Sequence, residues 1–233
     1  MRQIVLDTET TGLEPSLGHR VIEIGCVELD ERKLTGNHYH QYINPEREVD
    51  QGALDVHGIS NDFLAEKPTF IHIVDDFLDY VKGAELVIHN APFDVGFINH
   101  ELRLAEEMHG KSYGVIEDYC TVLDTLVYAR KKHPGQKNSL DALCKRYSVD
   151  NSQRDLHGAL LDSEILADVY LLMTGGQASL SLDNEAVAQS DTQATATKLT
   201  RNNQTFIVHR ATDDEQQAHE DFMTRVMNVE TTF

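Results

Sequence analysis

The order of its apolar segments constrains the fold of this 233-residue chain more than any other feature. Three strand-like segments come first, at residues 4–6, 21–29 and 38–43, with turn-forming residues between them. A segment with helical spacing (70–81), a buried strand (85–89), a helix from Asn90, a short strand (122–126) and helices at 139–147 and 159–173 follow. Strands followed by alternating helices and strands predict an α/β fold, in which helices flank a mixed sheet.

The composition changes sharply after Gly176. All five prolines and all fourteen glycines lie at or before this residue. Residues 179–204 are mostly Ala, Gln, Ser, Thr, Asn and Asp, and such a stretch buries too little apolar surface to offset its ordering entropy. We therefore expect a globular domain over residues 1–176, a flexible linker over 177–204 and a short tail over 205–233.

Several protein classes do not fit the sequence. No apolar stretch approaches the length needed to span a bilayer, and the first residues lack a signal-peptide layout, so we expect a cytoplasmic protein. Cys26, Cys120 and Cys144 are scattered and odd in number. This pattern favours reduced thiols packed among apolar residues over a disulfide framework or a zinc site.

The formal net charge of −19 disfavours a protein that holds duplex DNA on its own, because phosphate neutralisation supplies most of that affinity. Two interpretations remain open on charge alone. Either the chain does not bind nucleic acid, or it contacts nucleic acid briefly through bound cations while a partner protein supplies most of the affinity. The one basic cluster, residues 130–133 with Lys137, is compatible with a phosphate contact or with a solvated loop.

Acidic residues stand where predicted strands end and predicted helices begin. Asp7 and Glu9 close the first strand, and their two-residue spacing places both side chains on one face. Two carboxylates so placed repel each other unless a cation lies between them. Asp94 falls in the first turn of the helix from Asn90, where the helix dipole alone could explain an acid.

His157 and Asp162 form the last element of this pattern. His157 is expected on a loop before Gly158, and Asp162 in the first turns of the next helix, so both can converge on one centre. The complete order is Asp-x-Glu, Asp, His-x4-Asp. Hard divalent cations prefer oxygen ligands, and phosphoryl transfer uses two such ions about 3.5–4 Å apart. The pattern therefore predicts a two-metal phosphoryl-transfer site.

Three motifs make the chain resemble the DEDD exonuclease superfamily, in its histidine variant, on a ribonuclease-H-like fold. They are residues 4–12 (IVLDTETTG), 56–59 (VHGI) and 90–94 (NAPFD). Residues 1–176 are most similar to the epsilon family of proofreading subunits in bacterial DNA polymerase III, and the remainder is weakly similar. The resemblance implies a 3′→5′ exonuclease domain that removes mispaired 3′-terminal nucleotides from DNA with two divalent ions, Mg²⁺ or Mn²⁺.

The resemblance also implies roles for the acidic residues and the histidine. Asp7, Glu9 and Asp162 would hold the catalytic metals, and Asp94 would join the second metal. His157 would be the general base that takes a proton from the attacking water.

A nucleotide pocket is implied as well, lined by Thr8, Thr10 and His57 beside the metal-binding Asp7, Glu9 and Asp162. One departure from the family concerns Gln51 and Gly52, which stand where a Pro and a Glu are common. Gly52 is therefore left out of the expected substrate-binding residues.

Two segments beyond the globular domain predict partners. Residues 177–182 resemble a clamp-binding peptide, with Gln177, Leu180 and Leu182 as its contacts. Leu182 stands where an aromatic residue is common, so we expect weak binding to a sliding clamp.

The tail from Thr212 has the form of a helix. Thr212-Asp213-Asp214-Glu215 matches a capping box, and apolar residues then recur at helical spacing at Ala218, Phe222, Val226 and Val229. The resemblance implies docking to the polymerase (alpha) subunit, and a fold back onto the first domain remains the alternative. A small accessory, theta-like subunit is a further candidate partner.

Two other functions remain open. An RNA-directed 3′→5′ exonuclease of the same fold would carry the same acids, although such small enzymes do not need the linker and tail. A non-catalytic binding module could retain the fold, but it would have no reason to keep every acid together with His157.

Overall fold

The computed structural model describes residues 1–154, 156–175 and 212–229. The chain divides into two units, Met1–Leu180 and Ser181–Phe233. Gln177, Leu180 and Leu182, the predicted clamp contacts, lie outside the described residues, as does the predicted linker.

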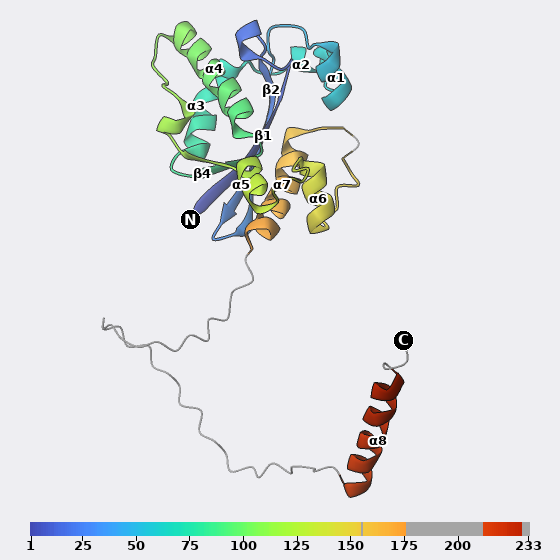
Figure 1. Ribbon diagram of the computed structural model, residues 1–233. Helices are drawn as coiled ribbons and strands as arrows, with labels where there is room; N and C mark the ends of the chain where they lie inside the picture. The colour runs from blue at the N-terminus through green and yellow to red at the C-terminus, as the bar shows by residue number, and fades with distance from the viewer. Residues whose placement is uncertain (155, 176–211, 230–233) are drawn as a thin grey trace, which may run out of the picture. The chain divides into compact units, whose positions relative to one another are not determined.

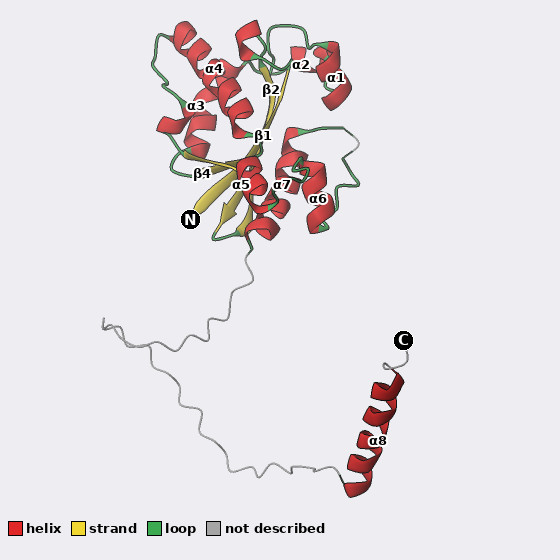
Figure 2. Ribbon diagram, viewed as in Figure 1, coloured by secondary structure: helices red, strands yellow, loops and turns green. Residues whose placement is uncertain are grey.

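A mixed sheet, yellow in Figure 2, forms the centre of the first unit. It has five strands in the order β3-β2-β1-β4-β5. The strands are β1 (Arg2–Thr10), β2 (Val21–Asp30), β3 (Lys33–Tyr42), β4 (Glu85–Ile88) and β5 (Thr121–Asp124). β2 pairs antiparallel with β1 and β3, whereas β4 is parallel to β1 and to β5. The predicted mixed α/β architecture is confirmed.

Helices cover the sheet on both faces (Figure 1). The helices of this unit are α1 (Gln51–His57), α2 (Asn61–Ala65), α3 (Phe70–Val81), α4 (Ala91–His109), α5 (Thr125–Lys132), α6 (Leu140–Tyr147) and α7 (Ala159–Thr174), with short 3₁₀ turns at Pro15–Leu17 and Ile116–Asp118. The bounds of α3 agree with its apolar spacing.

Three local predictions differ from the structure. The short helices α1, α2 and α5 were not anticipated, because five to eight residues show little apolar period. β5 ends at Asp124 rather than at 126, since the Asp124 carboxylate accepts the backbone N–H groups of Leu126 and Val127 and begins α5. Asn90 precedes α4 as expected, but it does so in the left-handed conformation (φ 67°), without a side-chain capping bond.

β1 is buried on both faces, which explains its uninterrupted apolar run. Ile4 and Leu6 pack with residues of α3 and α4, such as Phe77 and Phe97. Val5 faces the other way and packs with Leu166 of α7. Because side chains alternate along a strand, β1 separates two hydrophobic layers and offers one set of side chains to each.

β2 and the start of α7 approach each other closely at Gly25. A Cβ atom at Gly25 would overlap the backbone of Ala159 and Leu160. The hydroxyl of Ser163 donates a hydrogen bond to the Gly25 carbonyl oxygen at 2.9 Å. Gly25 is therefore needed for the backbone approach that places the first turn of α7 against the sheet.

The second unit contains one described helix, α8 (Asp213–Val229). The predicted capping box is confirmed: the Thr212 N–H donates to Glu215 Oε2 at 2.8 Å, and the Glu215 N–H donates to Thr212 Oγ1 at 3.4 Å. Phe222, on the predicted apolar stripe, is exposed. None of the helices in the described residues has the length and apolar character that a bilayer span requires.

The contact at Gly25 predicts a loss of stability on adding one methyl group there. Gly25→Ala should lower the free energy of unfolding by about 1–3 kcal/mol, because α7 must shift away from β2. Gly96→Ala is the matched control, since a Cβ atom there meets nothing within 4 Å and lies in the middle of α4, where it should add up to about 1 kcal/mol. Urea denaturation measures both, and equal stabilities for the two variants would contradict the packing argument.

Candidate active site

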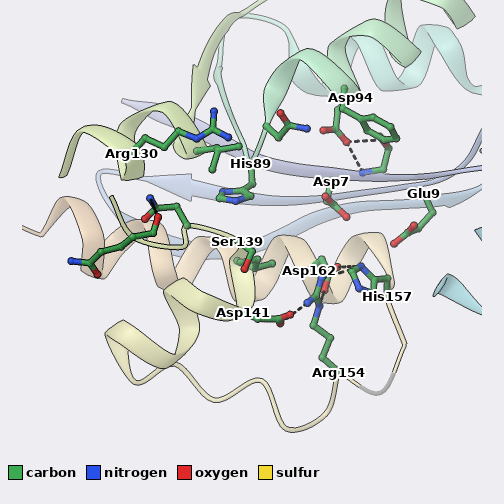
Figure 3. A pocket seen from close by; sticks show the side chains of 17 residues that line it. Asp7, Glu9, His89, Asp94, Arg130, Ser139, Asp141, Arg154, His157 and Asp162 are labelled. Atoms are coloured by element: carbon green, nitrogen blue, oxygen red, sulfur yellow. Dashed lines mark hydrogen bonds and ion pairs between the residues drawn. The ribbon is translucent and has the colours of Figure 1, made fainter. Parts of the chain in front are cut away.

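A cleft of about 750 Å³ opens at the carboxyl ends of β1 and β4 (Figure 3). All five predicted catalytic residues line it: Asp7, Glu9, Asp94, His157 and Asp162. We call this site the acidic cleft. The five predicted residues come from β1, the first turn of α4, the loop before α7 and the first turn of α7, so only the tertiary fold brings them together.

Asp7 and Glu9 reach the cleft because β1 extends beyond its parallel neighbour. The register between β1 and β4 ends where Leu6 lies opposite Ile88, whereas β1 continues to Thr10 through its pairing with β2. The two acids therefore lie within β1, near its carboxyl end, as predicted. Their side chains continue the row of Val5, which faces α7.

Asp94 lies on the opposite side of β1 and is 3% exposed. Its Oδ1 accepts hydrogen bonds from the backbone N–H of Thr8 at 3.0 Å and from the Thr8 hydroxyl at 2.7 Å. Thr8 points to this side because it alternates with Asp7 and Glu9 along the strand. Thr8 therefore ties the first turn of α4 to the strand that carries the other acids.

Glu9, His157 and Asp162 form the tightest group of potential metal ligands among the described residues. One ligand atom from each lies within 4.8 Å of the others. His157 is on the loop before α7, as predicted, and its backbone N–H donates to the Val56 carbonyl oxygen at 3.1 Å. Its Nδ1 lies 3.4 Å from Asp162 Oδ2, and its side chain is 46% exposed. The carboxylate oxygens of Glu9 and Asp162 in this group fit a hard divalent cation.

Arg154 is a residue of this cleft that sequence reasoning missed. Its Nε and Nη2 bind Asp162 Oδ1 and Oδ2 at 2.5 and 2.7 Å, and its Nη1 binds Asp141 Oδ1 at 2.7 Å. Nη2 also lies 3.0 Å from His157 Nδ1. The only sequence signal was an arginine three residues before His157 in a chain with 39 acidic and 20 basic residues.

Burial and mutual repulsion disfavour ionisation of the acids. The pKa of Asp7 is raised well above its usual value by burial first, and then by the charges of Asp94, Glu9 and Asp162. Burial, followed by Asp162 and Glu23, raises the pKa of Glu9 to about 8. Burial likewise raises the pKa of Asp94 to about 7, against the hydrogen bonds from Thr8. A cation in the cleft would reverse this tendency.

A second pocket, of about 410 Å³, lies beside the acidic cleft and shares Thr8, Glu9 and Phe93 with it. The predicted nucleotide-pocket residues Thr10 and His57 also line it, and so does Gly52. The Ile59 N–H donates to His57 Nδ1 at 3.0 Å, whereas the buried Nε2 has no hydrogen-bond partner among the described residues. Burial lowers the pKa of His57, which favours the neutral ring.

Two other sequence features have structural roles in the described part of the chain. His89 Nδ1 lies 2.9 Å from the Thr125 hydroxyl, so His89 joins the end of β4 to α5. The basic cluster is divided: Arg130 lines the acidic cleft, whereas Lys132 donates to the carbonyl oxygen of Met173.

The raised pKa values predict how metal-free stability depends on pH. The folded state holds a proton on Glu9 up to about pH 8, whereas an unfolded glutamate loses it near 4.5. The folded state therefore binds more protons in this window, and stability falls as pH rises from about 5 to 8. In EDTA, the free energy of unfolding should fall between about pH 5 and pH 8 in the parent and fall less in Glu9→Gln. The difference between the two decreases should be at least about 1.4 kcal/mol.

Denaturation curves at a series of pH values measure this difference. Glu48→Gln, at an exposed position outside the cleft, is the control and should follow the parent. Identical slopes for the parent and Glu9→Gln would show that Glu9 does not take up a proton on folding.

Comparisons with known proteins identify the family of the chain. The model of the RNase_T family, described as "Exonuclease", matches residues 4–170. DNA polymerase III subunit epsilon of Escherichia coli (strain K12) is 51% identical, over 94% of this chain and 90% of that protein. The epsilon subunit of Haemophilus influenzae is 49% identical, over 97% of this chain and 91% of that protein.

Solved structures with this fold include exonuclease X in complex with 5′-overhanging duplex DNA, at a TM-score of 0.56 and 26% identity, covering 74% of this chain and 91% of that one. A full-length 3′-exonuclease has a TM-score of 0.62 at 20% identity, covering 74% and 60% of the two chains, and shares the fold. The chain belongs to the RNase_T exonuclease family and, within it, to the epsilon subunits of DNA polymerase III, the 3′→5′ proofreading exonucleases.

Proposed function

We propose that this chain cleaves the terminal phosphodiester at a DNA 3′ end by two-metal-ion hydrolysis, in the cytoplasm, as the proofreading subunit of the replicative polymerase. One observation carries the proposal. Three buried or half-buried carboxylates and the exposed His157 converge with Asp94 on one cleft, although they come from four separate segments. A binding module would have no use for so costly a cluster of acids.

The acidic residues are the proposed metal ligands. Asp7, Glu9 and Asp162 would hold two divalent ions, Mg²⁺ or Mn²⁺, and Asp94 would join the second ion. Both Thr8 bonds end on Asp94 Oδ1, so Oδ2 is the oxygen that remains for a cation. Bound there, the ions would supply Lewis-acid stabilisation of the charge that develops on the phosphoryl oxygens.

His157 is the proposed general base. In the tautomer in which His157 Nδ1 carries the hydrogen and faces Asp162 Oδ2, 3.4 Å away, Nε2 is free to accept the proton of the attacking water. The backbone bond to Val56 holds the loop, while the half-exposed ring keeps access to the cleft. His157 thus combines a fixed backbone with a side chain that can reach a water molecule.

The substrate proposal uses the two adjoining cavities. A terminal nucleotide would occupy the pocket lined by Thr8, Thr10 and His57, with its phosphate directed to Asp7, Glu9 and Asp162 in the acidic cleft. A mispaired end would reach the site more easily than a paired end, because less free energy is needed to unpair it. This preference is the physical basis of proofreading.

DNA is favoured over RNA as the substrate by the relatives. The two epsilon subunits share about half of their residues with this chain over nearly its whole length, and both are named as parts of a DNA polymerase. An RNA-directed exonuclease of the same fold is the second candidate, and the assay below separates the two.

The activity is tested on matched oligomers: a 3′-mispaired primer, the paired primer and an RNA of the same sequence, each with Mg²⁺ or Mn²⁺. We expect the mispaired DNA to be degraded fastest, with no degradation in EDTA. His157→Ala should lower the rate by roughly 10²–10⁴-fold, the usual effect of losing a positioned general base. Asp7→Asn should abolish hydrolysis because it removes a metal ligand.

His89→Ala is the control for this experiment, since it removes a cleft histidine that contacts Thr125 rather than the acids. A loss as large as that in His157→Ala would show that the effect is not specific to the general base. Faster degradation of the RNA would reject the proposed substrate.

The partners are proposed from the tail. The polymerase (alpha) subunit would bind the segment 205–233, whose helix α8 begins at a capping box and exposes Phe222. Gln177, Leu180 and Leu182 would make a weak contact with a sliding clamp. A small theta-like subunit would bind the exonuclease domain.

Two fragments test this division of labour. A chain ending at Gly176 should retain metal-dependent exonuclease activity but fail to copurify with the polymerase, whereas a peptide of residues 200–233 should bind the polymerase alone. Pull-down against purified polymerase measures both, with Phe222→Ala in the peptide as a matched variant that should weaken binding. Polymerase binding by the truncated domain, with none by the peptide, would overturn the proposal.

A further inference from the structure

Among the described residues that line the acidic cleft, Asp162 is the carboxylate that a guanidinium, that of Arg154, binds through both oxygens. Nε and Nη2 form a two-pronged bond to the two oxygens of Asp162, at 2.5 and 2.7 Å (Figure 3). Both side chains are almost completely buried, at 9% and 4% exposure. Such forked, charge-assisted pairs are among the stronger hydrogen-bonded contacts in proteins.

The pair has an electrostatic reason. Asp162 lies near Glu9 and His157, and its charge also acts on Asp7. Without a cation, a buried carboxylate in such company is costly. Among the described residues, Arg154 is the cationic side chain that binds directly to a carboxylate of the proposed metal ligands. Its positive charge therefore offsets the charge of these acids when metal is absent.

The same atoms are needed by a divalent ion. The two oxygens of Asp162 that Arg154 binds are those that a metal would coordinate, and the guanidinium also contacts His157 Nδ1 at 3.0 Å. A guanidinium beside a divalent cation would be repelled by it. The two positive groups therefore exclude each other at Asp162.

A second anchor for Arg154 lies at the edge of the cleft. Nη1 binds Asp141 Oδ1 at 2.7 Å, and the side chain of Asp141 is 57% exposed. Asn151 also donates to Asp141 Oδ1, at 3.2 Å, which orients the carboxylate. Asp141 can retain the guanidinium after Asp162 is released, so that the arginine moves a short distance instead of entering solvent.

We propose that Arg154 is a resident counter-ion of Asp162 that competes with the divalent metal and so sets the metal concentration at which the site loads. This inference rests on the proposed metal site and adds a positioning residue to it. Metal binding exchanges the Arg154–Asp162 pair for a metal–Asp162 bond, while Asp141 keeps Arg154 at the rim. When no metal is bound, Asp162 therefore has a cationic partner, and fewer acids of the cluster are unpaired.

The test is a titration of the full chain with Mn²⁺, in which electron paramagnetic resonance measures free Mn²⁺. Arg154→Gln should bind Mn²⁺ about tenfold more tightly than the parent, because the competing charge is gone. The thermal midpoint in EDTA should fall, and the rise in midpoint on adding Mn²⁺ should be larger. Arg154→Lys, which keeps the charge but loses the fork, should lie between the two.

Arg130→Gln is the matched control. Arg130 lines the same cleft and carries the same charge, but no ion pair joins it to an acid among the described residues, so its variant should bind Mn²⁺ within about twofold of the parent. If Arg130→Gln binds Mn²⁺ as much more tightly as Arg154→Gln does, the effect comes from the overall charge of the cleft, and the specific competition at Asp162 is rejected. If Arg154→Gln fails to fold, the lysine variant carries the test with a smaller shift.

The outcomes separate this inference from the proposed function. Normal Mn²⁺ binding by the parent, with unchanged or weaker binding by both Arg154 variants, would overturn the competition and leave the metal site standing. No Mn²⁺ binding by the parent or by any variant would reject the metal site, and the competition with it.

Discussion

Repulsion between buried acids is the constraint on which the arrangement of this protein depends. Asp7, Glu9 and Asp162 approach one another at the end of β1, and Asp94 lies close enough for its charge to raise the pKa of Asp7. The sheet and its two hydrophobic layers must hold these groups together against their charges. The cluster of acids thus lowers the stability of the fold, and hydrophobic packing elsewhere offsets this loss, as is usual for catalytic centres.

Cations resolve the conflict. In the metal-free chain, Arg154 pairs with Asp162 while Thr8 donates two hydrogen bonds to Asp94, so two of the four carboxylates have partners. Asp7 and Glu9 remain, and burial and repulsion favour protonation of both. Divalent ions would satisfy all four carboxylates at once. This explains how a chain with a net charge of −19 can act on a polyanion.

Much of the fold could be predicted because it follows local periodicity. The apolar spacing of 70–81 predicts α3 with its observed bounds, and the uninterrupted run Ile4-Val5-Leu6 predicts a strand buried on both faces. Short elements escaped, since α1 and α2 contain too few residues to show a period. The left-handed Asn90 also escaped, because residue type indicates a helix start without specifying which backbone conformation makes it.

The sequence by itself determined the strands, the longer helices, and the acids and histidine that line the cleft. These follow from alternation along β1, helical spacing and the Asp-x-Glu, Asp, His-x4-Asp order, all of which are local patterns. Only the tertiary structure decided which residues of the site contact one another. Three contacts depend on where separate elements meet. Thr8 binds Asp94, and Gly25 lets α7 approach the sheet. Arg154 bridges Asp141 and Asp162. A long polar side chain on a loop has no period, so its partner is chosen by packing alone.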